Sequence, residues 1–157
     1  MTHQDRPRLR RRDLLGAALA AGLAAPAVAR GEDRDAAILR DLIAREDAAA
    51  FAYRGQQVPG LGDPAAQDED HAKALRVELQ GLIEPGVPRN PPLDPAARRL
   101  NDAGGDERRA AALALEADLV AQYHEAVLGI TEPAILQTAA TILACHAQRR
   151  ALLSYPP

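Results

Sequence analysis

The chain is poor in cysteine and in aromatic residues, and each shortage limits what it can be. Cys145 is the single cysteine among 157 residues, so no disulfide can form within the chain. Tryptophan is absent and aromatic residues make up 3% of the sequence, so a core must be built from alanine and aliphatic side chains. No segment alternates apolar and polar residues in the way that a half-buried strand does. These shortages favour an all-α domain whose helices pack closely.

A long hydrophobic run is also missing. The apolar run from Leu14 to Val28 holds about 15 residues, short of the roughly 20 that span a bilayer. It follows Arg10, Arg11 and Arg12 and leads into a small-residue cleavage site that ends at Ala29, which is typical of a twin-arginine signal peptide. We therefore expect residues 1–29 to direct export to the periplasm or the extracellular space, with residues 30–157 as the mature domain. An uncleaved membrane tether is the alternative, and we expect no stable membrane partner beyond the export machinery.

The mature part lacks an excess of positive charge. Residues 1–29 hold 5 of the 19 Lys and Arg and 2 of the 22 Asp and Glu, which leaves residues 30–157 with 14 basic and 20 acidic groups. The resulting net charge of −6 argues against nucleic acid as a partner.

What the sequence does contain is helical periodicity. We predict long helices over 33–54, 65–82, 106–128 and 131–153, and a short helical piece over 94–101. Thr131 is expected to cap the last helix, and Gly129 to close the one before it. The segment 81–95 holds five prolines and suits a long crossover. The fold expected is therefore an antiparallel four-helix bundle with one long crossover between the second and third helices.

Ionisable residues interrupt the inward stripes of these helices. The stripe of the last helix runs through Ile135, Ala139, Ile142, His146, Arg149 and Leu153, with a histidine and an arginine where an aliphatic residue would be expected. The other inward stripes carry a similar group on each helix: Leu39, Leu42, Glu46, Ala49 and Tyr53; Asp68, His71, Leu75 and Leu82; and Leu113, Glu116, Val120, Tyr123 and Val127. Four helices therefore direct ionisable groups at one centre.

This arrangement approximates the di-metal site of ferritin-like bundles. That site takes one Glu from each of two helices and a Glu-x-x-His motif from each of the other two. Glu46 and Glu116 match the single glutamates, Asp68 and His71 stand in for one motif, and His146 and Arg149 occupy the other.

Around these positions the chain resembles the secreted bacterial ferritin-like domain proteins of the di-iron carboxylate superfamily. The resemblance covers nearly the whole mature part. It lies in residues 46–53, in residues 71–75, in Leu115 and Glu116 followed by Tyr123, and in residues 140–143. It implies a ferritin-like bundle of a kind that often holds a non-haem di-iron centre.

The departure at Arg149 changes the expected metal count. A guanidinium has no lone pair to donate to a metal. Three carboxylates and Arg149 leave a charge of about −2, which one divalent ion would balance, as would two protonated histidines without metal. Two histidines with two or three carboxylates suit Fe, Mn or Zn better than Ca.

Three hypotheses follow from these residues. The first is a binding protein, not an enzyme, that holds a single Fe, Mn or Zn ion, with Arg149 replacing the second metal. The second is a metal-free structural or interaction module with a salt-bridged polar core. The third is a ferroxidase-type oxidase in which His146 and Glu69 restore ligands. The predicted ligands of the first hypothesis are Glu46, Asp68, His71, Glu116 and His146.

Five other residues on or near the stripes have simpler interpretations. His124 and Glu125 are expected at the surface, and Cys145 as a small packed residue. Tyr53 and Tyr123 are expected in the core, hydrogen-bonded to the cluster or to backbone. The chain is expected to be a monomer or a homodimer.

Overall fold

The structure is a computed structural model that describes residues 11–82, 94–105 and 107–155, with the backbone alone for 11–30. This part of the chain forms helices and contains no strand, which confirms the all-α class. The five helices are α1 (Arg11–Tyr53), α2 (Pro64–Gln80), α3 (Pro95–Asp102), α4 (Glu107–Gly129) and α5 (Pro133–Ser154).

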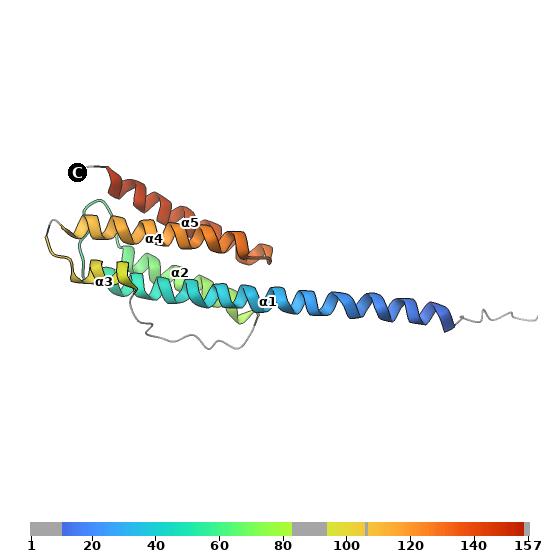
Figure 1. Cartoon of the computed structure of the whole chain (residues 1–157). Helices are drawn as coiled ribbons and strands as arrows, with labels where there is room; N and C mark the ends of the chain where they lie inside the picture. The colour runs from blue at the N-terminus through green and yellow to red at the C-terminus, as the bar shows by residue number, and fades with distance from the viewer. Residues whose placement is uncertain (1–10, 83–93, 106, 156–157) are drawn as a thin grey trace, which may run out of the picture.

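The four long helices lie along a common axis as two antiparallel pairs (Figure 1). α1 packs mainly on α2, and α4 packs mainly on α5, while smaller contacts join α1 to α4 and α2 to α5. The short α3 packs on α1 and α4 at the end where α1 stops. α2 ends at the opposite end of the bundle from the start of α3, and α1 extends beyond that end (Figure 1). Most of the predicted crossover, residues 83–93, lies outside the described residues.

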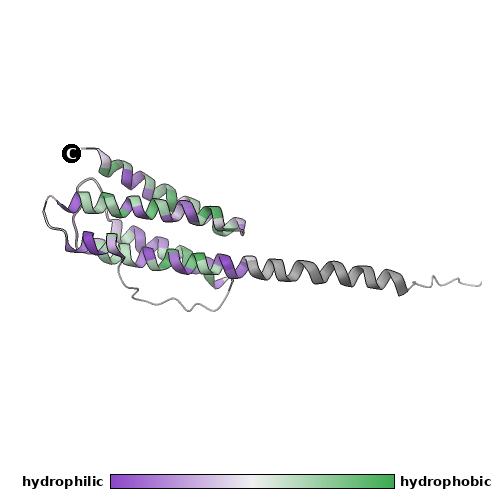
Figure 2. Ribbon diagram, in the orientation of Figure 1, coloured by the Kyte–Doolittle hydropathy of each residue, from purple (hydrophilic) through white to green (hydrophobic). Residues whose placement is uncertain are grey.

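Two apolar clusters fill the interior. Between them lie the buried ionisable residues that we call the polar centre: Glu46, Asp68, Glu116, His146 and Arg149. Each long helix carries both hydrophobic and hydrophilic residues (Figure 2), as burial of one face requires. Towards the α5 N-terminus the cluster includes Leu39, Leu42, Ile43, Leu75, Leu79, Tyr123, Ile135 and Ile142. Towards the α5 C-terminus it includes Ala49, Tyr53, Leu100, Ala112, Leu115, Leu119 and Leu153.

The predicted inward stripes are confirmed for α1 and α5, but the prediction is partly wrong for α2, where His71 and Leu82 are only partly buried, and for α4. All six stripe residues of α5 and all five of α1 are buried. In α4, Leu113, Val120 and Val127 are only partly buried. The buried positions are instead Ala111, Ala112, Leu115, Glu116, Leu119, Tyr123, Ala126 and Gly129. The buried face of α4 therefore combines small alanines with large side chains, while Leu113, Val120 and Val127 lie at its margin.

The start of α5 also differs from the prediction. Its N-cap residue is Glu132, and no side-chain hydrogen bond from that residue caps the helix. Asp35 of α1, which is 1% exposed, supplies the acceptor. Its carboxylate accepts from the backbone N–H groups of Thr131 at 3.0 Å and Glu132 at 2.8 Å, and from the Thr131 hydroxyl at 2.9 Å. Thr131 therefore anchors α5 to α1 and does not itself cap the helix.

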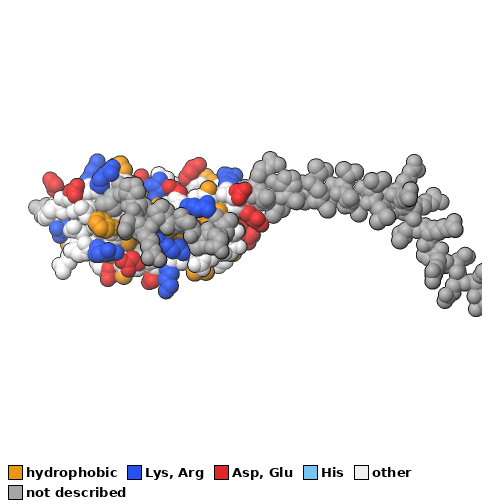
Figure 3. Space-filling model, turned by 90° about the horizontal axis from the view of Figure 1, so that it is seen from below, with side chains coloured by type: hydrophobic (Ala, Val, Ile, Leu, Met, Phe, Trp, Pro, Cys, Tyr) orange, Lys and Arg blue, Asp and Glu red, His pale blue; other side chains and the backbone are white. Residues whose placement is uncertain are grey.

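The N-terminal region and the surface add two further observations. Residues 11–29 of the predicted export signal belong to α1, and residues 1–10 lie outside the described part. Among the described residues, no helix combines the length and the apolar character that crossing a membrane requires. Acidic and basic side chains intermix on the face of the bundle seen in Figure 3.

Candidate metal centre

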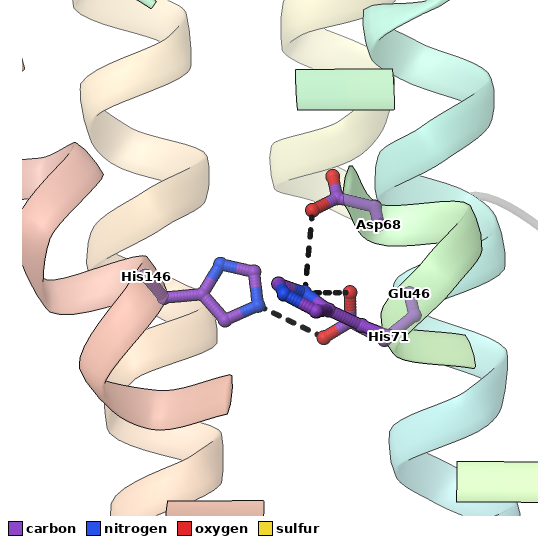
Figure 4. A group of neighbouring side chains, drawn as sticks. All are labelled: Glu46, Asp68, His71 and His146. Carbon is purple, nitrogen blue, oxygen red and sulfur yellow. Dashed lines mark hydrogen bonds and ion pairs between the residues drawn. The ribbon is translucent and has the colours of Figure 1, made fainter. Parts of the chain in front are cut away.

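Four buried or nearly buried side chains from three helices converge on one point of the core. Glu46 comes from α1, Asp68 and His71 from α2, and His146 from α5 (Figure 4). Each offers one ligand atom, and these atoms all lie within 4.8 Å of one another. Metal–ligand bonds of roughly 2.1 Å place opposite ligands about 4.2 Å apart, so small side-chain adjustments suffice. The group could therefore hold one metal ion.

Helix geometry explains how these residues reach the same level. Asp68 and His71 are three residues apart on one face of α2, and the Asp68 Oδ1 atom lies 3.8 Å from His71 Nδ1. The same His71 nitrogen lies 3.3 Å from Glu46 Oε2. The His71 ring meets the His146 ring edge-on at a centroid distance of 5.3 Å.

His146 lies between two carboxylates. Its Nε2 is 2.9 Å from Glu46 Oε1 and its Nδ1 is 2.9 Å from Glu116 Oε2. Burial opposes protonation of the ring, but the hydrogen bonds and charges of Glu116 and Glu46 outweigh it and raise the pKa of His146 to about 9. Without metal, the ring is therefore an imidazolium that donates from both nitrogens. While the Nδ1 proton is donated to Glu116, loss of the Nε2 proton would leave a lone pair on Nε2 that is free to bind a metal.

Glu116 lies in the polar centre but outside the group of four. Its Oε1 accepts from the Tyr53 hydroxyl at 2.6 Å and from Arg149 Nη1 at 3.1 Å, and its Oε2 faces His146. Both oxygens are therefore engaged by protein donors. In this geometry Glu116 contacts His146 from outside the group of four, and the direct ligand role that the sequence predicted for it stays a prediction.

Arg149 bridges carboxylates of two helices. Its side chain is 6% exposed, and it donates from Nη2 to Asp68 Oδ1 and from Nη1 to Glu116 Oε1. The structure divides the guanidinium between these two carboxylates. Asp68 Oδ2 and Arg149 Nε have no partner within the described part of the chain. Of the two Asp68 oxygens it is Oδ1 that faces His71, while the orphaned Oδ2 points away from the other ligand atoms (Figure 4).

The two buried acids at the centre have opposite pKa shifts. Burial and the Glu46 charge outweigh the attraction of Arg149 and raise the pKa of Asp68 to about 7. Burial alone would also raise the pKa of Glu46, but hydrogen bonds and charges from His146 and His71 lower it to about 2. The two pKa shifts differ because the neighbouring groups differ: Glu46 faces two histidines, whereas the pKa of Asp68 is raised by the Glu46 charge.

Two tyrosines complete the network, as the sequence predicted. The Tyr123 hydroxyl donates to Glu46 Oε1 at 2.6 Å, and the Tyr53 hydroxyl donates to Glu116 Oε1 at 2.6 Å. Burial and the adjoining carboxylates raise the pKa of both phenols, so both remain protonated donors.

The remaining sequence predictions divide into confirmed and wrong ones. His124 and Glu125 are exposed, as predicted, and Cys145 is a half-buried free thiol. Glu69 is exposed and pairs with Arg54 at 2.9 Å, so it is not available to restore a ligand. Asp35 was not predicted from the sequence, although it falls four residues before Leu39 on the inward stripe of α1, and that spacing could have revealed it.

Comparison of the chain with protein-family models, with curated proteins and with solved structures gave no match. Its own residues and geometry are therefore the basis for a functional proposal.

Proposed function

We propose that this chain is an exported ferritin-like four-helix bundle that binds one transition-metal ion through Glu46, Asp68, His71 and His146. The observation that carries the proposal is the convergence of these four ligand atoms within 4.8 Å in the core. Two imidazoles and two carboxylates suit Fe, Mn or Zn. Two antiparallel helix pairs with carboxylates and histidines at one level support the ferritin-like bundle, and residues 1–29 support export by the twin-arginine route.

We propose one metal ion and not two because the Arg149 guanidinium supplies positive charge in place of a second metal ion. Its guanidinium contacts Asp68 and Glu116, the two carboxylates that would otherwise face a second metal. Bound metal would supply a Lewis-acidic or redox-active cation at this point. The chain surrounds that point with apolar clusters, holds His146 through Glu116 and holds Glu46 through Tyr123. We propose metal binding or buffering without two-metal oxygen chemistry, in a monomer or homodimer that does not bind nucleic acid.

A second candidate, a metal-free module, has an observation of its own. His146 already contacts two carboxylates, and Arg149 contacts two as well. Buried charges paired in this way need no metal for compensation.

A cobalt titration separates the two candidates. Metal-free protein titrated with Co²⁺ should develop the visible absorption of protein-bound Co²⁺ and saturate at about one equivalent. His71→Ala and His146→Ala should each weaken binding by roughly 100-fold or more. His124→Ala, which changes an exposed histidine of α4, should bind like the unaltered protein. Absence of saturable binding in all four proteins would favour the metal-free module.

A further inference from the structure

His71 differs from the other three proposed ligands in its exposure. Glu46, Asp68 and His146 are each 0% exposed, whereas 14% of the His71 side chain is exposed. Its Nδ1 faces inward to Glu46 and Asp68. The His71 ring therefore separates the buried centre from solvent.

Two contacts fix the register of α2 against α5 around His71. Arg149 of α5 contacts Asp68 of α2, and Thr138 of α5 donates to Glu78 of α2 at 2.8 Å. The helices are antiparallel (Figure 1), so the level of His71 falls between these contacts, opposite Cys145.

Helical spacing places His71 and Cys145 on the sides of α2 and α5 that face each other. Asp68, His71 and Glu78 are spaced by three and seven residues, and Thr138, Cys145 and Arg149 by seven and four. Each set lies on one stripe of its helix. His71 and Cys145 are both partly buried, and α2 makes far fewer contacts with α5 than with α1. Of the four proposed ligands, His71 alone reaches the surface, and it does so between α2 and α5.

We propose that the metal ion enters and leaves the buried site between α2 and α5, past the His71 side chain. The proposal rests on the metal-binding function proposed above. Rotation of the His71 ring about its side-chain bonds opens this path without separating the two helix pairs. A cavity of about 760 Å³ at the loop between α1 and α2 is the alternative, but none of the four ligands lies in its wall. Tyr53, hydrogen-bonded to Glu116, separates that cavity from the centre.

The single cysteine allows a direct test. Alkylation of Cys145 with a bulky maleimide should cover the proposed path, and the reagent has no second thiol to attack in this chain. Uptake of Co²⁺ in stopped flow and its release to excess chelator should both slow by roughly tenfold or more, since passage limits both. The dissociation constant and the stoichiometry should stay unchanged. Cys145→Trp offers a second way to cover the path if alkylation perturbs folding.

Two controls complete the test. Cys145→Ser treated with the same reagent should exchange metal at the rate of the untreated protein. In that background, Ala66→Cys places the label in the wall of the alternative cavity and should leave both rates unchanged. Slowing by the Ala66 label, or unchanged rates with Cys145 covered, would overturn the proposed route while leaving metal binding intact. Absence of saturable Co²⁺ binding in unlabelled protein would instead overturn the proposed function.

Discussion

Arg149 and its two carboxylate partners form a buried charged group at the polar centre. The guanidinium is nearly buried and contacts Asp68 and Glu116, which are fully buried. Removal of one partner from such a group leaves charge that neither solvent nor a neighbour compensates. The adjacent Arg150 is exposed and carries the same charge on the same helix.

Arg149→Met should therefore destabilise the metal-free protein by about 3–5 kcal/mol at neutral pH. Arg150→Met should change the free energy of unfolding by less than about 0.5 kcal/mol. Urea denaturation in the presence of chelator measures both. Equal effects of the two substitutions would contradict the placement of Arg149.

Glu116→Gln tests whether Glu116 orients His146 or binds the metal itself. The amide keeps the size of the side chain but weakens the hold on the His146 Nδ1 proton. Metal affinity should fall by about 10–100-fold, as for other groups that orient a ligand, with binding still saturating at one ion. Glu125→Gln, an exposed change on the same helix, should have no effect. Complete loss of binding would show that Glu116 is a ligand.

At this scale the sequence predicted which residues meet, but not how they pair. The spacing of four and three residues along 131–153 was enough to place His146 and Arg149 on the buried stripe. Whether Arg149 would bind one carboxylate or two depends on side-chain reach between helices, which spacing does not determine. The same limit applies to Glu116, whose oxygens are taken by Tyr53, Arg149 and His146.

Among the elements, α5 has its N-terminus capped by a residue far away in the chain. Asp35 accepts three hydrogen bonds from Thr131 and Glu132 at the α5 N-terminus. Its negative charge also interacts favourably with the helix dipole there. The packing of α5 against the bundle therefore begins with a side chain of α1.

Asp35→Ala should lower the free energy of unfolding by about 1–2 kcal/mol, the usual cost of losing a helix cap. Asp33→Ala, an exposed change on the same helix, should be nearly neutral. Thermal denaturation followed by circular dichroism compares the two. An unaltered midpoint for Asp35→Ala would contradict the capping role.

The α4 register shows where the prediction of elements was limited. Alanine is abundant in 107–129, and it fits a buried stripe in more than one rotation of the helix. The sequence pattern therefore selected a stripe through Leu113 and Val120, while the fold buries the stripe through Ala112 and Leu119. In α5, which has larger apolar residues on one stripe, the prediction was confirmed.

For the molecule as a whole, buried charge makes stability depend on pH. The pKa of His146 is raised from 6.5 to about 9, so its stabilising contribution is complete below pH 6.5 and is lost as pH rises through 9. The pKa of Asp68 is raised from 3.8 to about 7, so its contribution is also lost as pH rises, between these two values. The pKa of Glu46 is lowered from 4.5 to about 2, and its contribution is lost only as pH falls through that range.

The metal-free protein should therefore become less stable as pH rises from about 5 to 9. His146→Gln should remove the part of this dependence between pH 6.5 and 9, whereas His124→Gln should retain it. Urea midpoints measured across this range, with chelator present, provide the comparison. A midpoint that rises steadily towards pH 9 would contradict the protonated state of His146.

The all-α class and the level at which the ionisable groups meet could be predicted from periodicity, since both follow from which residues fall on inward stripes. The crossover was inferred from the prolines of 81–95, most of which lie outside the described residues. The export signal also remains a prediction. The stripes identify the buried face of each helix but not the number of metal ions that bind. That number depends on how Arg149 and the histidines share the carboxylates.

The measurement that tests the central claim most directly is the metal content of residues 30–157 purified without chelator. A His71→Ala/His146→Ala variant and a His124→Ala variant, prepared in parallel, serve as comparisons. The proposal predicts about one equivalent of Fe, Mn or Zn per chain, retained in His124→Ala and lost in the double variant. Equal metal content in all three proteins, or none in any of them, would contradict a specific site at these residues. Two equivalents per chain would contradict the replacement of the second metal by Arg149.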